Sequence, residues 1–448
     1  MQSFHAGLHA GTATTDITPA IDTDPATGQP REIHLSGYVA RIGPAFGVHD
    51  PLFARALALS DGRQLALLVV CDLLGLARDL SLEIRRKIAT AAGTPVEAVM
   101  LACTHTHSGP ATLALHECGE VATSYLTTLP PRLVSLAEQA VTAMQPVTLD
   151  VGNASLPQGA HNRRGDGQEI DTDVGVARLR DPQGEAVALL INYGCHPVVM
   201  NADNRLISTD YPGAAIQALE TASGGAGFFL TGADGNVDPV RRGSFEDVEW
   251  LGQRLAGAVH DALTEIDAQP ADRGGGAATV TYACEQLALP LLTVPGAAEL
   301  DRLQAQYAEA LAAFADTEAA VEAKIRRAML AWADATLVRV WEGTVPDTIE
   351  APLQVIRVGD WALVGIPGEL FSGMGRQIKD ALPDIQTFIV GYANGDVGYI
   401  PDRAAYDVGG YEIAEAYRYY GYPAALAPEA GEMIVQASVR LAGRTSGF

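Results

Sequence analysis

Two histidines stand two residues apart directly after an apolar segment, a spacing that suits a metal site. The segment 98–103 (AVMLAC) predicts a short buried strand, and His105 and His107 follow it. In extended backbone, side chains two residues apart point the same way, so both imidazoles could converge at the carboxyl end of this strand, where open α/β sheets bind ligands. A hydrogen-bonded structural pair is the alternative. Metal binding is favoured because a buried pair without a metal needs partners for four ring nitrogens.

A third histidine, His196, closes the apolar segment 186–193, and Pro197 then takes the chain out of any strand ladder. A lone histidine at such a place is more often an ordinary core residue. Two strands that both end in histidine nevertheless favour a shared metal site. Beyond it, the polar stretch 203–210 precedes a predicted helix, which Ser208 or Asp210 could cap.

The loop at 231–239 follows another apolar segment and contains two glycines, which permit close backbone approach. Three polar side chains occupy alternate positions in it: Asp234, Asn236 and Asp238. This spacing also opens a calcium-binding loop, but such a loop needs glycine sixth and glutamate twelfth, where this chain has Pro239 and Phe245. A calcium loop is therefore excluded, and a catalytic loop and a plain turn remain equally supported.

Three further groups could take part in chemistry. Glu369 stands in a Gly/Pro turn after the segment 361–366, either as a zinc carboxylate or as a solvated turn residue. Arg163 lies in a polar loop, where an arginine is by default surface charge. A group of tyrosines could line a pocket or simply pack: Tyr392, Tyr399, Tyr406, Tyr411, Tyr417, Tyr419, Tyr420 and Tyr422. Nitrogen and oxygen donors at separate strand ends together predict a hydrolytic zinc site with three or four ligands.

Strand-like and helix-like segments alternate along the chain, and turn signals at 60–62 and 181–184 indicate hairpins. The predicted strands are 55–59, 65–71, 98–103, 174–179, 186–193, 227–230, 353–358, 361–366 and 387–390, and the predicted helices are 80–92, 132–144, 214–221 and 245–266. Hairpins together with helical crossovers predict an α/β fold of layered, mixed β-sheets flanked by helices.

Residues 297–340 have a different pattern, because apolar side chains recur there at three-to-four spacing on a polar surface. This spacing predicts an amphipathic helix, or a helical hairpin broken near Asp316 and Thr317. Packing against the sheet is favoured for it over a lid above a site. We expect residues 1–448 to form a single catalytic domain in which 297–340 is a helical insertion.

Composition excludes several classes of partner. The chain has 448 residues, 54 acidic and 30 basic side chains and a formal net charge of −24. Nucleic acids and anionic membranes need a positive surface, so neither is expected as the main partner. No apolar run approaches the ~18–20 residues of a membrane span, and the N-terminus shows no export signal. Five widely spread cysteines without CxxC spacing predict buried free thiols of a cytoplasmic protein.

Taken together, these motifs resemble the catalytic domain of the neutral/alkaline (non-lysosomal) ceramidases. They follow that family's order from residue 11 to about residue 425, so the resemblance covers nearly the whole chain. The matching pieces lie at 16–19 (DITP), 104–110, 162–163, 196–198, 201, 210, 235–239, 367–369, 394, 399, 406 and 411–412. The resemblance implies the layered ceramidase-like catalytic fold and an enzyme that hydrolyses a linear amide C–N bond.

Carried over position by position, the resemblance implies a Zn2+ ion bound by His105, His196, Glu369 and Tyr399. It also implies that His107 and Arg163 bind or polarise the substrate amide. Asn236 and Tyr411 fall in matching motifs and are assigned to substrate binding.

The chain departs from that family in the loop 235–239. The ceramidases carry Gly-Asp-Val-Ser-Pro there, with the serine as nucleophile, whereas this chain has Asn236 for the aspartate and Asp238 for the serine. An aspartate beside metal-activated water suits a general base, so we hypothesise that water attacks directly and Asp238 takes the proton. His107, Arg163 and Tyr399 would then stabilise the developing oxyanion.

The expected function is a zinc-dependent hydrolase that cleaves a linear N-acyl amide, either a small molecule or lipid-like. Ceramidases acting on ceramide carry a C-terminal immunoglobulin-like domain and are exported or membrane-tethered, and we expect neither here. A true neutral ceramidase hydrolysing N-acylsphingosine is the first alternative, and a non-catalytic protein with a structural or vestigial metal site is the second. A His-x-His amidohydrolase barrel is excluded, because neither eight strand–helix repeats nor a metal-bridging lysine is evident. The acyl chain, the amine and homo-oligomerisation stay open.

Overall fold

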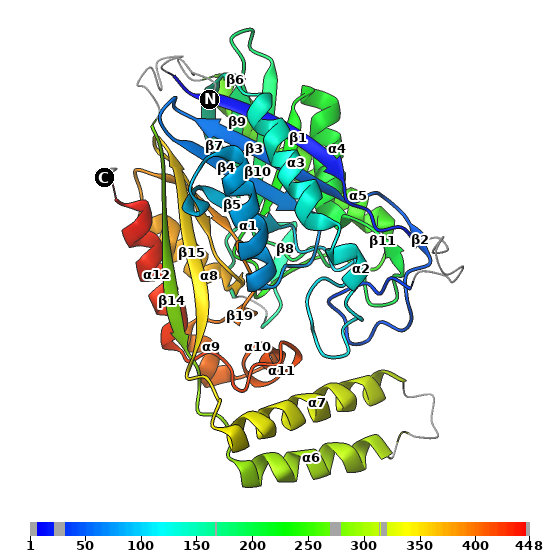
Figure 1. Ribbon diagram of the computed structural model, residues 1–448. Helices are drawn as coiled ribbons and strands as arrows, with labels where there is room; N and C mark the ends of the chain where they lie inside the picture. Colours follow the sequence, from blue (N-terminus) through cyan, green and yellow to red (C-terminus); the bar gives the residue numbers. More distant parts are fainter. Residues whose placement is uncertain are drawn as a thin grey trace.

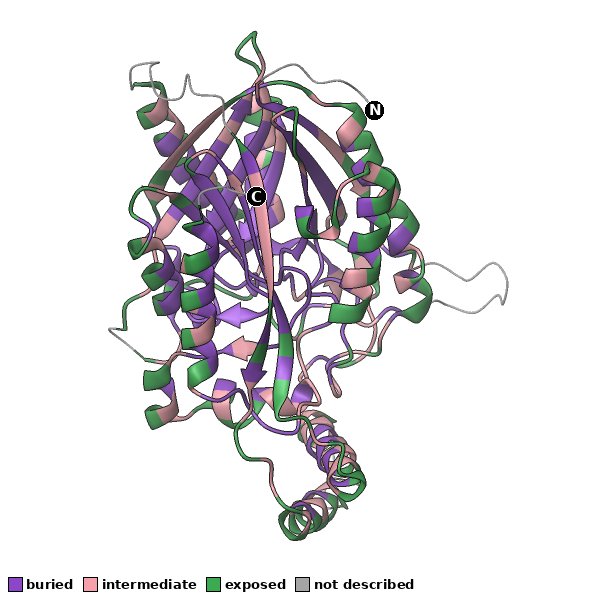
Figure 2. Cartoon of the chain, turned by 60° about the vertical axis from the view of Figure 1, so that its left-hand side comes forward, coloured by how far each residue is buried: buried purple, intermediate pink, exposed green. Residues whose placement is uncertain are grey.

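The computed structural model describes residues 7–21, 32–165, 168–268, 279–312, 314 and 320–444. Three β-sheets form its centre, and helices cover the outer side of each sheet (Figure 1). The central strands are largely buried, whereas the outward faces of the flanking helices are exposed (Figure 2). The predicted α/β fold of layered, mixed sheets flanked by helices is confirmed.

The first sheet has five strands in the order β5-β4-β3-β1-β6. They are β1 (His9–Asp16), β3 (Phe53–Ser60), β4 (Leu65–Cys71), β5 (Val99–Cys103) and β6 (Gln145–Pro146). β3 and β4 form the predicted antiparallel hairpin. β4 and β5 are parallel, because helix α1 (Arg78–Ala92) and the 3₁₀ turn η1 (Val96–Ala98) return the chain between them. Helices α1 and α3 (Leu129–Thr142) bury their apolar sides against this sheet, and the short α2 (Thr123–Leu126) precedes α3.

The second sheet has the order β12-β10-β9-β7. Its strands are β7 (Thr148–Ser155), β9 (Asp173–Arg180), β10 (Ala186–Tyr193) and β12 (Ala226–Thr231). β9 and β10 form the second predicted hairpin, and β10 runs parallel to β12 after the crossover helix α4 (Asp210–Ser223). Helix α5 (Phe245–Asp267) begins where the Ser244 hydroxyl accepts a hydrogen bond from the Asp247 amide, and it covers the sheet together with α4.

The third sheet has the order β14-β15-β16-β18. Its strands are β14 (Val280–Pro290), β15 (Thr348–Val358), β16 (Trp361–Gly365) and β18 (Gln386–Val390). β16 and β18 are parallel, with α8 (Ser372–Asp380) in the crossover between them. Helices α8 and α12 (Glu429–Ala442) bury their apolar residues against the outer face of this sheet.

The inner faces of the three sheets share one apolar core, to which each sheet contributes large side chains: Leu57, Leu68, Leu190, Phe228, Leu363 and Phe388. Three two-stranded ladders join loops that lie beyond the sheets: β2 (Gly47–Val48) with β11 (Leu206–Ile207), β8 (Ala160–Asn162) with β13 (Val237–Pro239), and β17 (Glu369–Leu370) with β19 (Tyr399–Ile400). Because each sheet contains one parallel pair, each brings strand carboxyl ends to the same region.

Two helices, α6 (Ala297–Ala312) and α7 (Ala320–Glu342), form a hairpin that projects from one side of the molecule (Figures 1 and 2). The predicted break at 316–317 lies outside the described residues. The expected packing against a sheet is wrong. The hairpin instead buries Leu300, Met329 and Trp332 against the loop at 113–118 and against Tyr419. Short helices lie in the stretch of chain that faces it: α9 (Arg403–Val408), α10 (Tyr411–Ala414) and α11 (Ala416–Tyr419).

The cysteines match their prediction as free thiols, since none of the five is bridged and four are buried. None of the helices in the described ranges has the length and apolar character that crossing a membrane requires.

Candidate metal and amide-binding site

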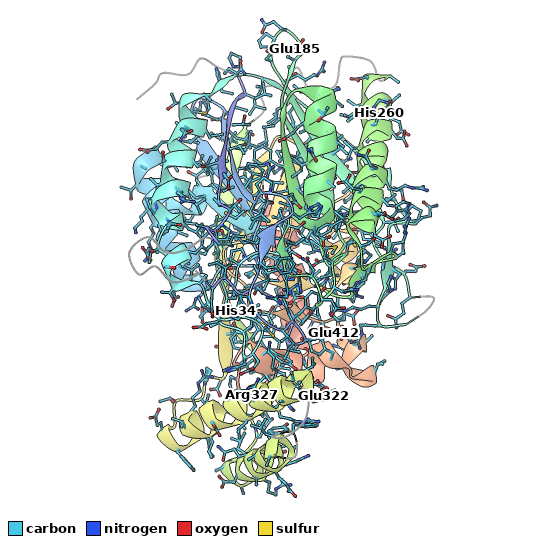
Figure 3. The ribbon with its side chains drawn as sticks, turned by 90° about the vertical axis from the view of Figure 1, so that its right-hand side faces the viewer. His34, Glu185, His260, Glu322, Arg327 and Glu412 are labelled. Atoms are coloured by element: carbon cyan, nitrogen blue, oxygen red, sulfur yellow. The ribbon has the colours of Figure 1, made fainter. Side chains whose placement is uncertain are left out.

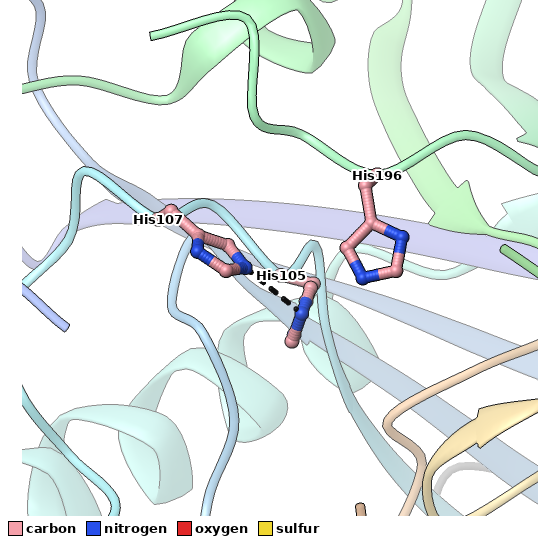
Figure 4. Close-up of side chains that lie close together, drawn as sticks. All are labelled: His105, His107 and His196. Atoms are coloured by element: carbon pink, nitrogen blue, oxygen red, sulfur yellow. Dashed lines mark hydrogen bonds between the residues drawn. The ribbon is translucent and has the colours of Figure 1, made fainter. Parts of the chain in front are cut away.

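Three imidazoles form a compact buried group at the carboxyl ends of β5 and β10 (Figure 4). His105 and His107 follow β5, and His196 follows β10. The Nε2 atoms of His105 and His107 lie 3.2 Å apart, and one ring nitrogen of each of the three histidines lies within 4.8 Å of the others. The convergence predicted from the sequence is therefore present, and it includes His107 as well as the two histidines assigned as ligands.

The backbone reaches this arrangement differently from the prediction. His105 has φ +66°, in the left-handed region, so the two histidines do not sit on extended backbone. The expectation of strand geometry at 105–107 is wrong, because the strand ends at Cys103 and the chain turns sharply. Tyr392, which also has a positive φ of 54°, stacks on the His105 imidazole at a centroid distance of 3.7 Å. Left-handed residues that are not glycine are strained and gather at functional sites.

Backbone carbonyls fix two of the three rings. His105 Nδ1 donates to the Leu74 carbonyl at 2.8 Å, and His196 Nδ1 donates to the Asp234 carbonyl at 2.7 Å. Both rings consequently turn Nε2 toward the shared centre, the orientation in which an imidazole binds a metal. Burial lowers the pKa of His105 to about 3, so its ring is neutral at physiological pH.

Close packing, and not a hydrogen bond at Nδ1, holds the His107 ring in place. Its Nδ1 is buried and has no hydrogen-bond partner among the described residues. Gly37 lies directly against it, and a Cβ at that position would come within 2.3 Å of Nδ1. The Tyr38 ring packs beside it at 4.9 Å.

The Glu369 carboxylate completes the group from the third sheet. Glu369 begins β17, just beyond the end of β16, and its side chain is buried. Oε2 lies 3.0 Å from His196 Nε2, while Oε1 accepts a hydrogen bond from the Tyr420 hydroxyl at 2.7 Å. Burial opposes a charged His196, but the Asp234 carboxylate and the bond to Glu369 raise its pKa to about 9. A basic nitrogen and a carboxylate oxygen at this separation both suit a shared cation.

Tyr399 lies beside the group, since it pairs with Glu369 across the β17–β19 ladder. Its ring is 6.4 Å from the His196 ring and nearly parallel to it. The Arg163 guanidinium also lies over the Tyr399 ring, 5.1 Å from its centre. The predicted fourth ligand is therefore next to the histidines, and its role as a ligand stays a prediction.

Asp238 sits between two arginines. Its Oδ1 is 3.4 Å from Arg163 Nη1, and its Oδ2 is 2.8 Å from Arg242 Nη1. Arg163 also donates through Nε to Glu412 at 3.0 Å, and its Nη2 is buried without a hydrogen-bond partner in the described chain. Burial raises the pKa of Asp238, but His196 and the two arginines outweigh it, so the pKa lies below its usual range.

The two residues assigned to substrate binding lie at the margins of this group. The Asn236 side chain accepts a hydrogen bond from the Ser372 amide at 2.8 Å, and its backbone carbonyl accepts one from the Arg163 amide at 3.0 Å. Asn236 thus holds the start of α8 and the arginine loop. Tyr411 is 47% exposed, with its ring 5.9 Å from that of Tyr399.

Three functional contacts escaped sequence reasoning. Arg242 carries no signal beyond its place four residues after Asp238, and Tyr420 was one of eight clustered tyrosines. Asp210, expected as a helix cap, has φ +59° and accepts from the Val199 and Met200 amides, which holds the loop behind His196. Tyr399, Tyr406, Tyr417, Tyr420 and Tyr422 line a cavity of only about 10 Å³, so this part of the cluster is packing with space for roughly one water.

The site lies at the end of the molecule that faces the helical hairpin. Figure 3 shows Glu412, which binds Arg163, toward the end of the molecule that carries the hairpin residues Glu322 and Arg327, whereas Glu185 at the β9–β10 turn lies at the opposite end. The β10 strand runs from that turn toward the site, as expected for ligands at strand carboxyl ends.

With this geometry in place, comparison with known proteins is informative. Residues 21–233 match the family described as "Neutral/alkaline non-lysosomal ceramidase, N-terminal". The resemblance to the neutral/alkaline ceramidases is confirmed. The matched range contains the three histidines and Arg163, while Asp238, Glu369 and Tyr399 lie beyond it.

Individual ceramidases agree with this assignment. The neutral ceramidase of Pseudomonas aeruginosa is 24% identical over 86% of this chain and 67% of its own length. Neutral ceramidase B of Dictyostelium discoideum is 25% identical over 48% of this chain and 34% of its own length. Neutral ceramidases are hydrolases of amide C–N bonds, and similarity to them confirms the predicted enzyme class.

Solved structures show the same fold. The crystal structure of the Pseudomonas aeruginosa enzyme superposes with a TM-score of 0.72 and 20% identity, covering 98% of this chain and 74% of that one. A structure described as ceramidase complexed with C2 gives a TM-score of 0.71 and 18% identity, with 98% and 75% covered. At these identities the likeness establishes the fold, and the residue roles rest on the geometry above.

Proposed function

We propose that the chain is a zinc-dependent hydrolase that cleaves a linear N-acyl amide. The observation that carries this proposal is the buried meeting of His105, His196 and Glu369, each from the strand end of a different sheet. The ceramidase relatives support the reaction class, since they are hydrolases of amide bonds.

The donor set suits zinc. Catalytic zinc sites use imidazole nitrogen and carboxylate oxygen, commonly with three protein ligands and one open position. His105 and His196 commit Nδ1 to carbonyl groups, so each keeps Nε2 for a metal. We assign these two histidines and Glu369 as ligands and Tyr399 as the fourth. His107, whose Nε2 is 3.2 Å from His105 Nε2, is the alternative to Tyr399.

Zinc bound there would polarise the amide carbonyl and lower the pKa of water toward ~7. The chain's own residues would orient the amide. The buried Nη2 of Arg163 has no hydrogen-bond partner among the described residues and the guanidinium lies over Tyr399, so Nη2 can donate to an amide oxygen as negative charge develops on it. His107, in contact with His105, can donate a second hydrogen bond to the same oxygen. Tyr411, at the exposed margin, suits contact with an apolar substituent.

Asp238 is our candidate for the proton acceptor, and its two ion pairs bear on that role. Ion pairs with Arg163 and Arg242 keep it ionised and also lower its basicity. A base of lowered pKa contributes less to general-base catalysis at neutral pH. Its second role would be to hold Arg163 in place. Asp238→Asn and Asp238→Glu separate these two roles. If Asp238 accepts the proton, its carboxylate is needed at a fixed distance from the substrate. If it only holds Arg163, asparagine is tolerated far better.

For the substrate, we propose a small-molecule or lipid-like N-acyl amide, with ceramide as one member of the test panel. The departure from the ceramidase serine at position 238 is the reason for proposing an amide other than ceramide. A true ceramidase stays the second candidate, because both curated relatives are named neutral ceramidases.

The experiment is amine release by the zinc-loaded protein from ceramide and from N-acyl amines and N-acyl amino acids of increasing chain length, with and without a chelator. His105→Ala tests the metal site, and His260→Ala, an exposed histidine on α5 far from the site, is its control (Figure 3). We expect chelator-sensitive release that His105→Ala abolishes and His260→Ala leaves unchanged.

The panel separates the candidates. Release from soluble amides but not ceramide supports the amidase proposal, and release from ceramide supports the ceramidase. Zinc binding without release of any amine, in a protein that unfolds when His105 is removed, would favour a structural metal site and overturn the proposal.

A further inference from the structure

The segment 418–422 connects the helical hairpin to the proposed metal site. At its centre, the Tyr420 hydroxyl donates to Glu369 Oε1 at 2.7 Å, while the other carboxylate oxygen lies 3.0 Å from His196 Nε2. Asp396 Oδ2 is a more distant acceptor for the same hydroxyl, at 3.5 Å. One oxygen of Glu369 is thereby tied to Tyr420, and the other faces the histidines.

Packing fixes the Tyr420 ring. It lies parallel to the Tyr422 ring, with 6.2 Å between centroids and 6° between planes. Gly398, with φ +79°, lies against it just before β19, and a Cβ at 398 would come within 3.1 Å of the ring. The phenol consequently has one position from which its hydroxyl reaches Glu369.

The hairpin in turn fixes the backbone on the C-terminal side of Tyr420. From α7, the Trp332 indole N–H donates to the Tyr422 carbonyl at 2.8 Å, and Arg339 donates to the Gly421 carbonyl at 3.0 Å. Trp332 is fully buried. Both carbonyl groups that follow Tyr420 are therefore bound by the same helix.

The side before Tyr420 is bound as well. Arg418 donates to the Tyr307 hydroxyl of α6 at 2.9 Å, and its guanidinium lies 4.7 Å above the Trp332 ring. The Tyr419 carbonyl accepts from the His116 amide at 2.9 Å. Every residue of this short segment is thus attached either to the hairpin, to the loop that the hairpin covers, or to Glu369.

We infer that Tyr420 is a positioning residue for Glu369, and that the α6–α7 hairpin sets metal affinity by holding the 418–422 segment in place. The inference rests on the proposed metal site. A hydrogen bond to the non-coordinating oxygen of a ligating carboxylate orients that carboxylate, and loss of such a partner typically weakens metal binding by about 10–100-fold. The described residues of the hairpin accordingly support the site from outside and contribute no ligand to it.

The test is zinc affinity, measured by competition with a chromophoric chelator, for wild type and Tyr420→Phe. Tyr125→Phe is the matched control, because the Tyr125 side chain is buried and its hydroxyl donates to the Ile17 carbonyl just after β1. We expect zinc to bind about 10–100-fold more weakly to Tyr420→Phe. Tyr125→Phe should bind zinc as tightly as wild type.

A second variant tests the hairpin. Trp332→Phe retains a buried aromatic ring and removes the indole N–H, so we expect a smaller weakening in the same direction. A drop in melting temperature for Tyr420→Phe with unchanged zinc affinity would show a purely structural role and overturn the inference. Equal zinc affinity for Trp332→Phe and wild type would overturn the part assigned to the hairpin. Failure of wild type itself to bind zinc would instead reject the proposed function.

Discussion

Gly37 provides a direct test of how the chain holds His107. A Cβ at this position would lie 2.3 Å from His107 Nδ1, a distance that real side chains do not adopt, so one of the two must move. Gly37 also has φ +93°, where an alanine is strained. Gly184, in the β9–β10 turn, has φ +90° and nothing within 4 Å of its would-be Cβ. Alanine at 184 therefore reproduces the backbone strain without the collision.

The expected magnitudes follow from this pairing. Backbone strain should lower the free energy of unfolding of both variants by about 1–3 kcal/mol. Overpacking against the imidazole should lower that of Gly37→Ala by about 1–3 kcal/mol more. Urea unfolding at pH 7 should therefore show Gly37→Ala to be the less stable of the two by that second amount. The displaced His107 should also reduce amide hydrolysis in Gly37→Ala, while Gly184→Ala retains wild-type turnover.

Zinc titration of the same two proteins distinguishes the roles of His107. If His107 is a ligand, zinc binds Gly37→Ala more weakly. If it binds substrate, KM rises and zinc affinity does not change. Equal stability and equal activity of the two variants would refute the reasoning, because the close approach of Gly37 to the imidazole would then have no consequence.

Three further predictions concern the surroundings of the site. Asp238→Asn should lower the free energy of unfolding at pH 7 by about 1–3 kcal/mol, because hydrogen bonds from two charged groups are weakened. The folded-state pKa of Asp238 lies below its usual value of 3.8. The Asp238 carboxylate therefore stabilises the folded protein fully above pH 3.8, and this contribution is lost as pH falls through the folded-state pKa. The urea midpoints of wild type and Asp238→Asn should accordingly converge below about pH 4. A free zinc concentration of 100 times its Kd adds about 2.7 kcal/mol to the free energy of unfolding, so removing that zinc with a chelator should lower the melting temperature. Calorimetry before chelation, after it and after zinc is added back checks this. In Gly235→Ala the new Cβ would lie 2.3 Å from the Glu369 carbonyl oxygen, so this variant should bind zinc more weakly. Gly257 lies within helix α5 and has nothing within 4 Å of a would-be Cβ, so Gly257→Ala should raise the urea midpoint slightly.

Much of the fold could be predicted because buried strands in this chain are long and bounded by clear turns. The predictions at 65–71 and 186–193 match β4 and β10 residue for residue. Strands β1, β7 and β14 were missed. Their sequences, such as HAGTATTD in β1, are rich in small or polar residues and lack apolar periodicity. Pairing with a neighbouring strand, such as β3 for β1, therefore determines their conformation.

The sequence predicted which segments meet at the site, but not the backbone conformation and side-chain contacts with which they meet. Polar residues after apolar strands identified His105, His196 and Glu369, because ligand sites lie at strand carboxyl ends. The left-handed backbone of His105 has no local sequence signal, and Tyr392, which stacks on its ring, comes from the loop after β18 of the third sheet. The Tyr420 contact depends on the docking of a hairpin 80 or more residues earlier in the chain, which no spacing rule reports.

The meeting of three sheets at one point has a consequence for how the chain folds. His196 and Glu369 are 173 residues apart, and neither belongs to the sheet that carries His105. Closing loops of this length comes late, because local hairpins form before contacts of high sequence separation. A zinc ion bound there, as we propose, could therefore not nucleate folding by gathering neighbouring ligands, as zinc does in small zinc domains. Acquisition of tight zinc binding during refolding should instead coincide with the last kinetic phase, which makes the metal a reporter of complete assembly.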